Sequence, residues 1–344
     1  KGGEEGSKRN AYMEFLGLLG SDSRHILREM GTTKSEKNEA YWNAFEAGQP
    51  LPKPKMTFAT QKFFGYLKSS GIDVRDDEDK ISLAPMTDHK ILSMSNGQVG
   101  PEMFNSKDLS PERGGLFDIG ITGGPEGNKW SHYNLVEPIV NPVFKNPVQS
   151  LLGLSKEEFD GLTEGSLGVK KKSTGHFEMF DTVNEKKVRD IHVLGNPIVK
   201  AAAAAKPDAF SSPYVEDETL AGGAAFHAML SDLNVNDALL QALGNIKTAT
   251  SITKKDDEVK KAKYLRGLRD TGFDKASDAY VLRNMAVLPP VMRPSIADNG
   301  TITHADVSQL YRDHMLVNQT AKEGMLLDIL PHSENIKTRR NLYD

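Results

Sequence analysis

Residues that could do chemistry occur in this sequence, but their spacing does not assemble a reactive site. Nine histidines are scattered over 344 residues, and none stands four positions from another, the spacing that would place two imidazoles on one helix face. The chain has no cysteine, which excludes thiolate metal sites, disulfides and a cysteine nucleophile and is compatible with a reducing compartment. We therefore expect neither a metal site nor a cofactor in this chain.

Two further patterns are also better explained by structure than by chemistry. The acidic run Asp76–Asp79 lacks the spacing and the downstream glutamate of a calcium loop, so a solvated turn is favoured. The pair Gly165-Ser166 lacks the flanking glycines of a nucleophile elbow, and no glycine-rich loop ends in Lys-Ser or Lys-Thr. An independent hydrolase or kinase has no support.

Positive charge is local. The 43 Lys and Arg residues are nearly balanced by 47 Asp and Glu, and a net charge of −4 with a pI near 6.2 produces no general attraction to nucleic acid or anionic lipid. Four clusters could nevertheless bind phosphates with release of counterions. They are Lys170–Lys172, Lys186–Arg189, Lys254–Lys263 and Lys337–Arg340. For any single cluster a solvated face is the favoured alternative, because neighbouring acids cancel part of the charge.

Apolar periodicity and turn residues indicate alternating helical and strand-like stretches, with no run long enough to cross a bilayer. Helices are expected at Tyr12–Met30 (two, with a tight joint), Lys37–Glu46, Thr57–Ser70, Leu151–Leu162, Thr219–Gly244, Lys254–Arg269, Ala305–Leu327 and Glu334–Asp344. Short strands are expected within Asp73–Asn146, including Leu116–Ile121, and within Val169–Gly195 and Tyr280–Pro294. The pattern predicts an α+β protein of several parts with irregular small sheets.

The first stretch with a recognisable order of motifs is Lys1–Val74. It carries Gly2-Gly3, Met13-Glu14, Leu27–Met30 and Thr32–Ser35 in sequence. This series resembles the C-terminal end of the β subunit of the multisubunit DNA-directed RNA polymerases.

A second stretch, from about Leu83, resembles the N-terminus of the β′ subunit of the same enzymes. The resemblance is carried by Ile91–Val99, Ser110–Phe117 and His132–Ile139. In the family a cysteine-rich zinc ribbon lies between the last two elements. Here the short turn Gly123–Lys129 stands in its place, or the ribbon is deleted, so its zinc is not carried over.

The most specific match is Val287–Pro294, VLPPVMRP, which is similar to the Val-Leu-Pro-Pro-x-x-Arg-Pro motif of β′. Asp298–Gly300, Ala305–Val307 and Leu310–Arg312 follow at the family's spacing. Two prolines stiffen the approach to a turn, and a helix follows, so the residues themselves predict a rigid base, a projecting loop and a long helix.

The resemblance implies four parts: a β-like clamp anchor at residues 1–80, a β′-like segment without zinc ribbon at 81–150, a clamp-like region at 151–294, and at 295–344 the lid with the start of the clamp-helix hairpin. Ile296–His304 would be the lid, and Ala305–Asp344 the hairpin that docks a σ-like or other promoter-specificity factor. Expected near nucleic acid are Arg293, Asn299, Thr301 and His304. Expected on the partner-facing surface are Arg312, Asn318, Lys322, Arg339 and Arg340. The alternative, that these arginines brace the fold, is equally compatible with the sequence.

The Asn-Ala-Asp-Phe-Asp-Gly-Asp loop that holds catalytic Mg²⁺ in this family is absent from the sequence. The resemblance thus implies a part of a nucleotidyltransferase complex that is not catalytic alone, with Mg²⁺ held by another chain or by residues missing from this sequence. Implied partners are other polymerase subunits, a specificity factor, template DNA and RNA, but no membrane. A cytoplasmic location is expected, in a bacterium or an infected cell, with virion packaging as an alternative. A viral or phage-type enzyme and fused bacterial subunits both remain open. The rivals are a helical scaffold or virion structural protein, and a regulator that mimics clamp parts.

Overall fold

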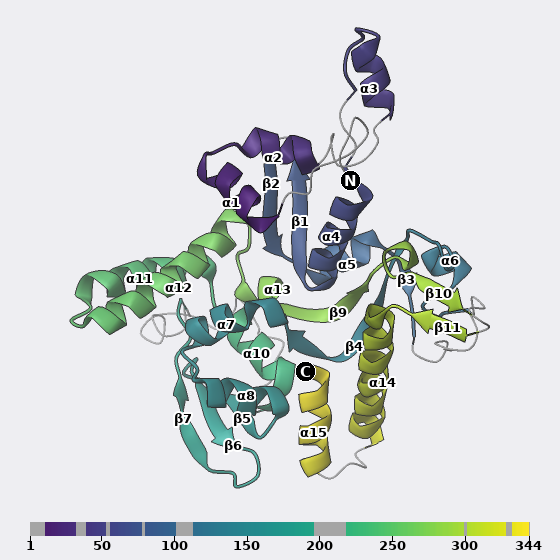
Figure 1. Cartoon of the computed structure of the whole chain (residues 1–344). Coiled ribbons are helices and arrows are strands. Elements are labelled where there is room, and N and C mark those ends of the chain that lie inside the picture. Colours follow the sequence, from purple (N-terminus) through teal and green to yellow (C-terminus); the bar gives the residue numbers. More distant parts are fainter. Residues whose placement is uncertain are drawn as a thin grey trace. The chain divides into compact units, whose positions relative to one another are not determined.

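The computed structural model describes residues 11–31, 39–52, 56–77, 80–100, 113–195, 218–298, 301–327 and 332–343. The chain divides into two compact units, Lys1–Tyr66 and Leu67–Asp344. Figure 1 labels the helices and strands along the chain.

The first unit consists of short helices whose apolar side chains are exposed. Its helices are α1 (Tyr12–Gly20), α2 (Arg24–Gly31), α3 (Glu39–Glu46) and the first part of α4 (Phe58–Ser69). The two helices predicted within Tyr12–Met30 are confirmed. No residue of α1, α2 or α3 is buried, and Met13 is 75% exposed. Because helices of eight or nine residues are marginal in water by themselves, contact with further protein surface would stabilise them.

The second unit contains several small sheets instead of one large one, which confirms the α+β class. Its strands are β1 (Ile72–Asp77), β2 (Lys80–Pro85), β3 (Ser95–Gln98), β4 (Trp130–Val140), β5 (Leu167–Lys171), β6 (Phe177–Asp181), β7 (Lys187–Ile191), β8 (Thr219–Leu220), β9 (Val281–Val287), β10 (Ser295–Asp298) and β11 (Thr301–His304). β3, β4 and β9 form one sheet in that order, and β7, β6, β5 and β8 form another. β1 with β2, and β10 with β11, are separate antiparallel hairpins.

Helices of the second unit lie between and beside these sheets. They are α5 (Asp88–Met94), α6 (Ile119–Thr122), α7 (Lys145–Leu152), α8 (Lys156–Glu164), α10 (Gly222–Ser231), α11 (Val235–Thr248), α12 (Ile252–Asp270), α13 (Ala276–Tyr280), α14 (Asp306–Leu327) and α15 (His332–Tyr343), with short 3₁₀ turns at Pro142–Phe144 and Pro290–Met292.

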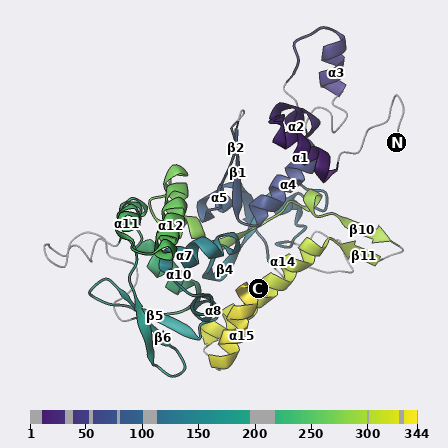
Figure 2. The ribbon, with the colours of Figure 1, turned by 60° about the vertical axis from the view of Figure 1, so that its left-hand side comes forward.

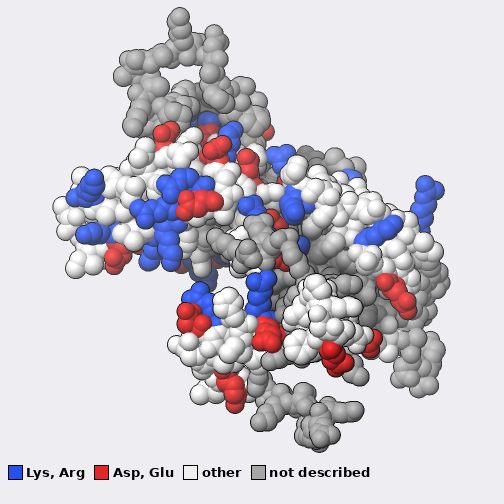
Figure 3. Space-filling model, turned by 90° about the horizontal axis from the view of Figure 1, so that it is seen from above, with Lys and Arg blue, Asp and Glu red and all other residues white. Residues whose placement is uncertain are grey.

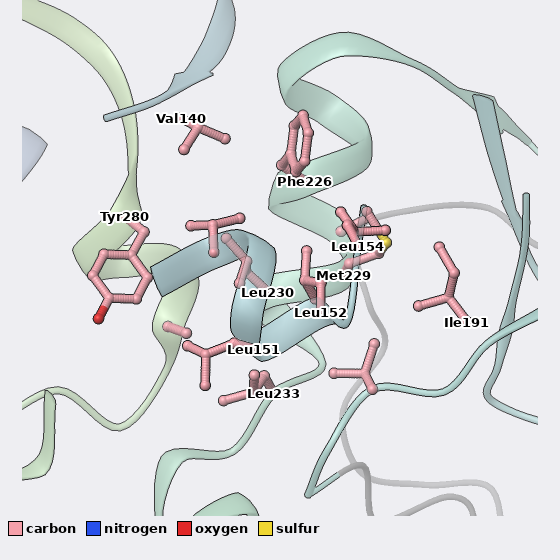
Figure 4. Close-up of a cluster of buried hydrophobic side chains, with 14 of the residues drawn as sticks. Val140, Leu151, Leu152, Leu154, Ile191, Phe226, Met229, Leu230, Leu233 and Tyr280 are labelled. Carbon is pink, nitrogen blue, oxygen red and sulfur yellow. The ribbon is translucent and has the colours of Figure 1, made fainter. Parts of the chain in front are cut away.

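The main core is built around α10, which is apolar on nearly every side and therefore lies at the centre of the packing. Phe226, Met229 and Leu230 of α10 belong to one buried cluster with Leu151 and Leu152 of α7 (Figure 4). The apolar side chains of β5, β6 and β7 close one side of this cluster, and those of α11 and α12 another. Alternation along β5 places Lys170 and Lys171 on opposite faces of the sheet, and Lys171, whose side chain is 13% exposed, pairs with Asp232 at the end of α10 at 2.7 Å.

Turn residues divide two stretches that the sequence analysis treated as single helices. α7 ends at Gly153, which has a positive φ of 62°, and α8 begins at Ser155, whose hydroxyl and Glu158 form a capping box. α10 and α11 are separated in the same way, because Asn234 caps the start of α11. The predicted helical character was right and the predicted continuity was wrong.

The strand expected at Leu116–Ile121 is also wrong. The Asp118 carboxylate accepts hydrogen bonds from the backbone N–H groups of Gly114 and Ile121 and so caps the short helix α6. These bonds lower the pKa of Asp118. Local capping outweighs the β propensity of the run.

The chain from β9 to α15 follows the predicted order of strand, prolines, projecting loop and helices. β9 leads into Pro289 and Pro290, the hairpin β10–β11 follows, and α14 begins two residues after β11. Figure 2 shows the hairpin extending beyond the N-terminal end of α14, away from α15. No helix in the described part of the chain is long and apolar enough to cross a membrane. The predicted part boundaries at residues 80, 150 and 294 remain predictions.

Candidate nucleic-acid interface

Arg293 forms the base of the β10–β11 hairpin, and its side chain is fully buried. Its guanidinium donates to the carbonyl oxygen of Leu288 (2.8 Å), to the hydroxyl of Ser308 (3.3 Å) and to the carbonyl oxygen of Leu116. Burial lowers the pKa of Arg293 to about 10, so the group is still charged at neutral pH. Arg293 thus joins the end of β9, the loop before α6 and the first turn of α14. These hydrogen bonds agree with the alternative that Arg293 braces the fold. The proximity of Arg293 to nucleic acid remains a prediction.

A stack of three side chains continues from Arg293 into the hairpin. The guanidinium carbon lies 4.8 Å from the ring centroid of Phe117, and the ring of His304 stacks on Phe117 with centroids 5.4 Å apart and an interplanar angle of 25°. Phe117 and His304 are 6% and 4% exposed. The hydroxyl of Ser295 lies 2.8 Å from Nδ1 of His304 and closes the stem of the hairpin. Cation–π and stacking contacts of this kind are strengthened by desolvation.

The arm of the hairpin is exposed where it can be described. Ile296 is 66% exposed, and apart from β10 and β11 themselves no described helix or strand packs along either strand beyond isolated contacts. Of the residues expected near nucleic acid, Asn299 lies outside the described residues, and only the backbone of Thr301 is described. His304 belongs to the buried base instead of the exposed arm.

A row of polar contacts fixes one face of α14 to β9 and β4. The Tyr311 hydroxyl donates to the Ala286 carbonyl oxygen and accepts from the Leu288 N–H, both at 3.2 Å. One turn later His314 stands between Tyr133 and the carbonyl oxygen of Leu342. Burial lowers the pKa of His314, which favours the neutral ring.

Asn318 continues this row. Its amide accepts from the N–H of Val136 (2.8 Å) and donates to the carbonyl oxygen of Asn134 (2.9 Å). These bonds satisfy the β4 backbone between Asn134 and Ile139, where the pairing of β4 with β9 is irregular. Asn318 therefore makes an internal contact, on the side of α14 opposite to its solvent face.

Both arginines of α15 point toward the body of the unit. Arg339 pairs with Glu137 of β4 at 3.1 Å, and the side chains are 22% and 9% exposed. Burial raises the pKa of Glu137 against the lowering effect of Arg339, and no described residue hydrogen-bonds to its Oε1. Arg340 pairs with Glu164 of α8. Both contacts correspond to the bracing alternative.

Of the residues expected to face a partner, Arg312 and Lys322 are the two with exposed side chains on α14. Arg312 lies 3.9 Å from Asp313, a weak and solvated pair. Lys322 lines a groove of about 970 Å³ between α14 and the edge formed by β3 and β4, together with Gln98, Asn134 and Gln319. Lys322 follows Asn318 by one helical turn and lines the same groove, so its exposed side chain lies at the edge of the inner face of α14, whereas Arg312 lies on another side of the helix.

The sequence cluster Lys254–Lys263 becomes a basic surface on α12. Lys254, Lys255 and Lys263 form no ion pair within the described part of the chain, and neither does Arg266 on the same helix. Lys255 and Arg266 are eleven residues apart and so point in nearly the same direction, separated by roughly 16 Å along the axis. Figure 3 shows Lys and Arg gathered at the left, where α12 lies in Figure 1.

The sequence pattern predicts no separate role for Phe117 or Arg266. Phe117 carries no periodic or charge signal, since its importance arises only when a loop and a hairpin almost 190 residues apart meet. In the described residues no group of three or more His, Asp or Glu side chains could hold a metal ion.

Comparisons with known proteins found bacterial RNA polymerase subunits. Similar to this chain are proteins named DNA-directed RNA polymerase subunit beta′ from a Sulfurovum species, 24% identical over 75% of this chain, and from Azobacteroides pseudotrichonymphae, 26% identical over 72% of this chain. The same subunit of a Nitratiruptor species is 25% identical over 70%. The matched regions are 19%, 20% and 18% of these relatives, so the chain spans about a fifth of their length. No family profile matches.

Proposed function

We propose that this chain is a non-catalytic part of a multisubunit DNA-directed RNA polymerase, in which a β-like end is joined to a β′-like beginning. The observation that carries the proposal is the similarity to bacterial β′ subunits over about three quarters of the chain. The geometry after Val287 supports it, because a braced base supports an exposed hairpin beside two helices.

In this proposal the β10–β11 hairpin is the lid, which keeps RNA apart from template DNA. Its physical basis is the contrast between a buried base at Arg293 and His304 and an arm on which Ile296 is exposed. An arm held in this way can separate strands by steric exclusion and needs no reactive group. The expected contacts of Asn299 and Thr301 with nucleic acid belong to this arm.

The hairpin of α14 and α15 is proposed to dock a σ-like or other specificity factor through two exposed side chains, Arg312 on the solvent side of α14 and Lys322 at the mouth of the groove beside β3 and β4. The inner face is occupied by Asn318 and by the ion pairs of Arg339 and Arg340. These three residues are proposed to act by holding the helices in place, while the factor meets the solvent-facing side.

The basic surface of α12 is proposed to bind the nucleic-acid backbone. Its cations are unpaired among the described residues, and their separation along the helix suits several successive phosphates. Catalysis, with its Mg²⁺, is assigned to residues outside this sequence, because the acidic metal-binding loop of the family is not among these 344 residues.

The α12 surface is tested by the salt dependence of DNA binding. Replacement of Lys255, Lys263 and Arg266 by glutamine should lower the slope of log K against log salt by roughly 2 to 3, since each phosphate contact contributes about 0.9. Lys260 and Lys261 provide the matched control, because their ammonium groups already pair with acids one turn before them. Equal slopes in the two variants would exclude this surface as the binding site.

The lid assignment is tested by shortening Ile296–His304 at its tip within the transcribing assembly. The proposal expects a longer RNA–DNA hybrid, measured by nuclease protection, while the circular dichroism of the chain is unchanged. A shortened chain that unfolds, or that folds and leaves the hybrid unchanged, would count against the assignment.

A further inference from the structure

The β10–β11 hairpin is attached to the rest of its unit almost entirely at one end. Its strands pair with each other over Ser295–Asp298 and Thr301–His304, and no other described element packs along them beyond isolated contacts. The contacts that set the direction of the arm must therefore lie at the base of the hairpin, where Ser295 and His304 are hydrogen-bonded.

At the base of the hairpin, the ring of Phe117 contacts both the guanidinium of Arg293 and the imidazole of His304. Arg293 belongs to the chain entering the hairpin and His304 to the chain leaving it, so one ring contacts both sides of the stem. Phe117 itself comes from a distant loop that α6 and the Asp118 cap hold in place. If the hairpin swivelled about its base, the ring of Phe117 would lose its contact with Arg293 or with His304.

We propose that Phe117 is a positioning residue that fixes the direction in which the hairpin projects. Phe117 contacts the hairpin through its ring and not through backbone hydrogen bonds. Removing the ring should therefore release the arm without disrupting the β10–β11 pairing or the core around α10. The positioning role itself does not depend on the proposed function. Only its consequence does, namely that a swivelling arm would no longer keep RNA apart from template DNA.

The absence of cysteine from the chain permits a specific test. Ile296→Cys places a single spin label on the exposed arm, and Leu240→Cys, at a position 69% exposed on α11, places one on a matched control site. In the full chain, Phe117→Leu keeps an apolar side chain but loses the ring. We expect about a tenfold rise in the mobile spectral component at residue 296, in line with the strength of stacked and cation–π pairs, and no change at residue 240.

Phe117→Tyr should restore the immobile spectrum at residue 296, because it retains the ring. Unchanged mobility at residue 296 in a folded Phe117→Leu chain would overturn the proposal, and so would an equal rise at residue 240, which would indicate general loosening. If Phe117→Leu fails to fold, Phe117→Met with the same labels decides between these results.

The positioning role of Phe117 and the lid assignment can be refuted independently of each other. A released arm that leaves the RNA–DNA hybrid unchanged in the transcribing assembly would support the positioning role of Phe117 and contradict the lid assignment. An arm that stays fixed would contradict the positioning role alone.

Discussion

Replacing Arg293 by methionine should destabilise the second unit strongly, because this residue supplies donors to three separate segments. Methionine fills much of the same volume but leaves the carbonyl oxygens of Leu288 and Leu116 without this donor. Each buried acceptor left unpaired costs about 1–3 kcal/mol. The lost contact with Phe117 adds about 1–2 kcal/mol. Relief of the buried charge offsets part of the sum, and we expect a net loss of about 3 kcal/mol in the free energy of unfolding.

The chain contains two tryptophans, one in each unit, which makes this loss measurable. In a Trp42→Phe background the fluorescence of Trp130 in β4 reports the second unit alone. Urea unfolding should then show a midpoint lowered by roughly 1 M for Arg293→Met, given the slopes usual for chains of this size. Arg266→Met is the matched control, since the side chain of Arg266 is exposed, forms no ion pair among the described residues, and should contribute under about 0.5 kcal/mol. Equal midpoints for the two variants would refute the bracing role of Arg293.

Three further outcomes follow from the geometry. Since burial lowers the folded-state pKa of His314, the unfolded chain binds this proton more readily, so stability should fall as pH drops below about 6.5. Urea midpoints at pH 7 and 5 should differ less in His314→Gln. Arg339→Met should lower the free energy of unfolding by about 3 kcal/mol, because it leaves a buried glutamate of β4 unpaired. Arg340→Met should lower it by under about 1 kcal/mol, because Arg340 is more exposed. Equal losses in the two variants would contradict this difference. Gly223→Ala would place the new Cβ 1.4 Å from a carbonyl oxygen of β4 and should prevent normal folding. The Cβ of Gly244→Ala meets nothing within 4 Å, so this variant should stabilise α11 by up to about 1 kcal/mol. Circular dichroism during thermal unfolding measures both effects.

The sequence predicts the order of elements best where periodicity and turn residues agree. The strand before Pro289, the projecting loop and the helix that follows it are predicted from local patterns, because prolines and turn residues act on the backbone directly. At Leu116–Ile121 the prediction was wrong, since the decisive interaction is the side chain of Asp118 with two backbone N–H groups. β propensity alone does not contain that information.

The side to which a charged residue points is the part that the sequence predicts least. Arg339 and Arg312 both lie in stretches that are predicted to be helical. Arg339 is 22% exposed and meets a buried carboxylate, whereas Arg312 is 44% exposed and lies 3.9 Å from its neighbour Asp313. The difference depends on Glu137, two hundred residues earlier, whose position is set by β4. The same long-range origin explains why Phe117 could be placed in a motif but not in a stack.

The most direct test of the account is the composition of an active transcription complex purified from the natural source through a tag on this chain. If the chain is a polymerase subunit, the purified complex should synthesise RNA and contain this chain in one-to-one ratio with a chain bearing the acidic Mg²⁺-binding loop. Transcribing complexes that lack this chain, or that contain it only in trace amounts, would contradict the account.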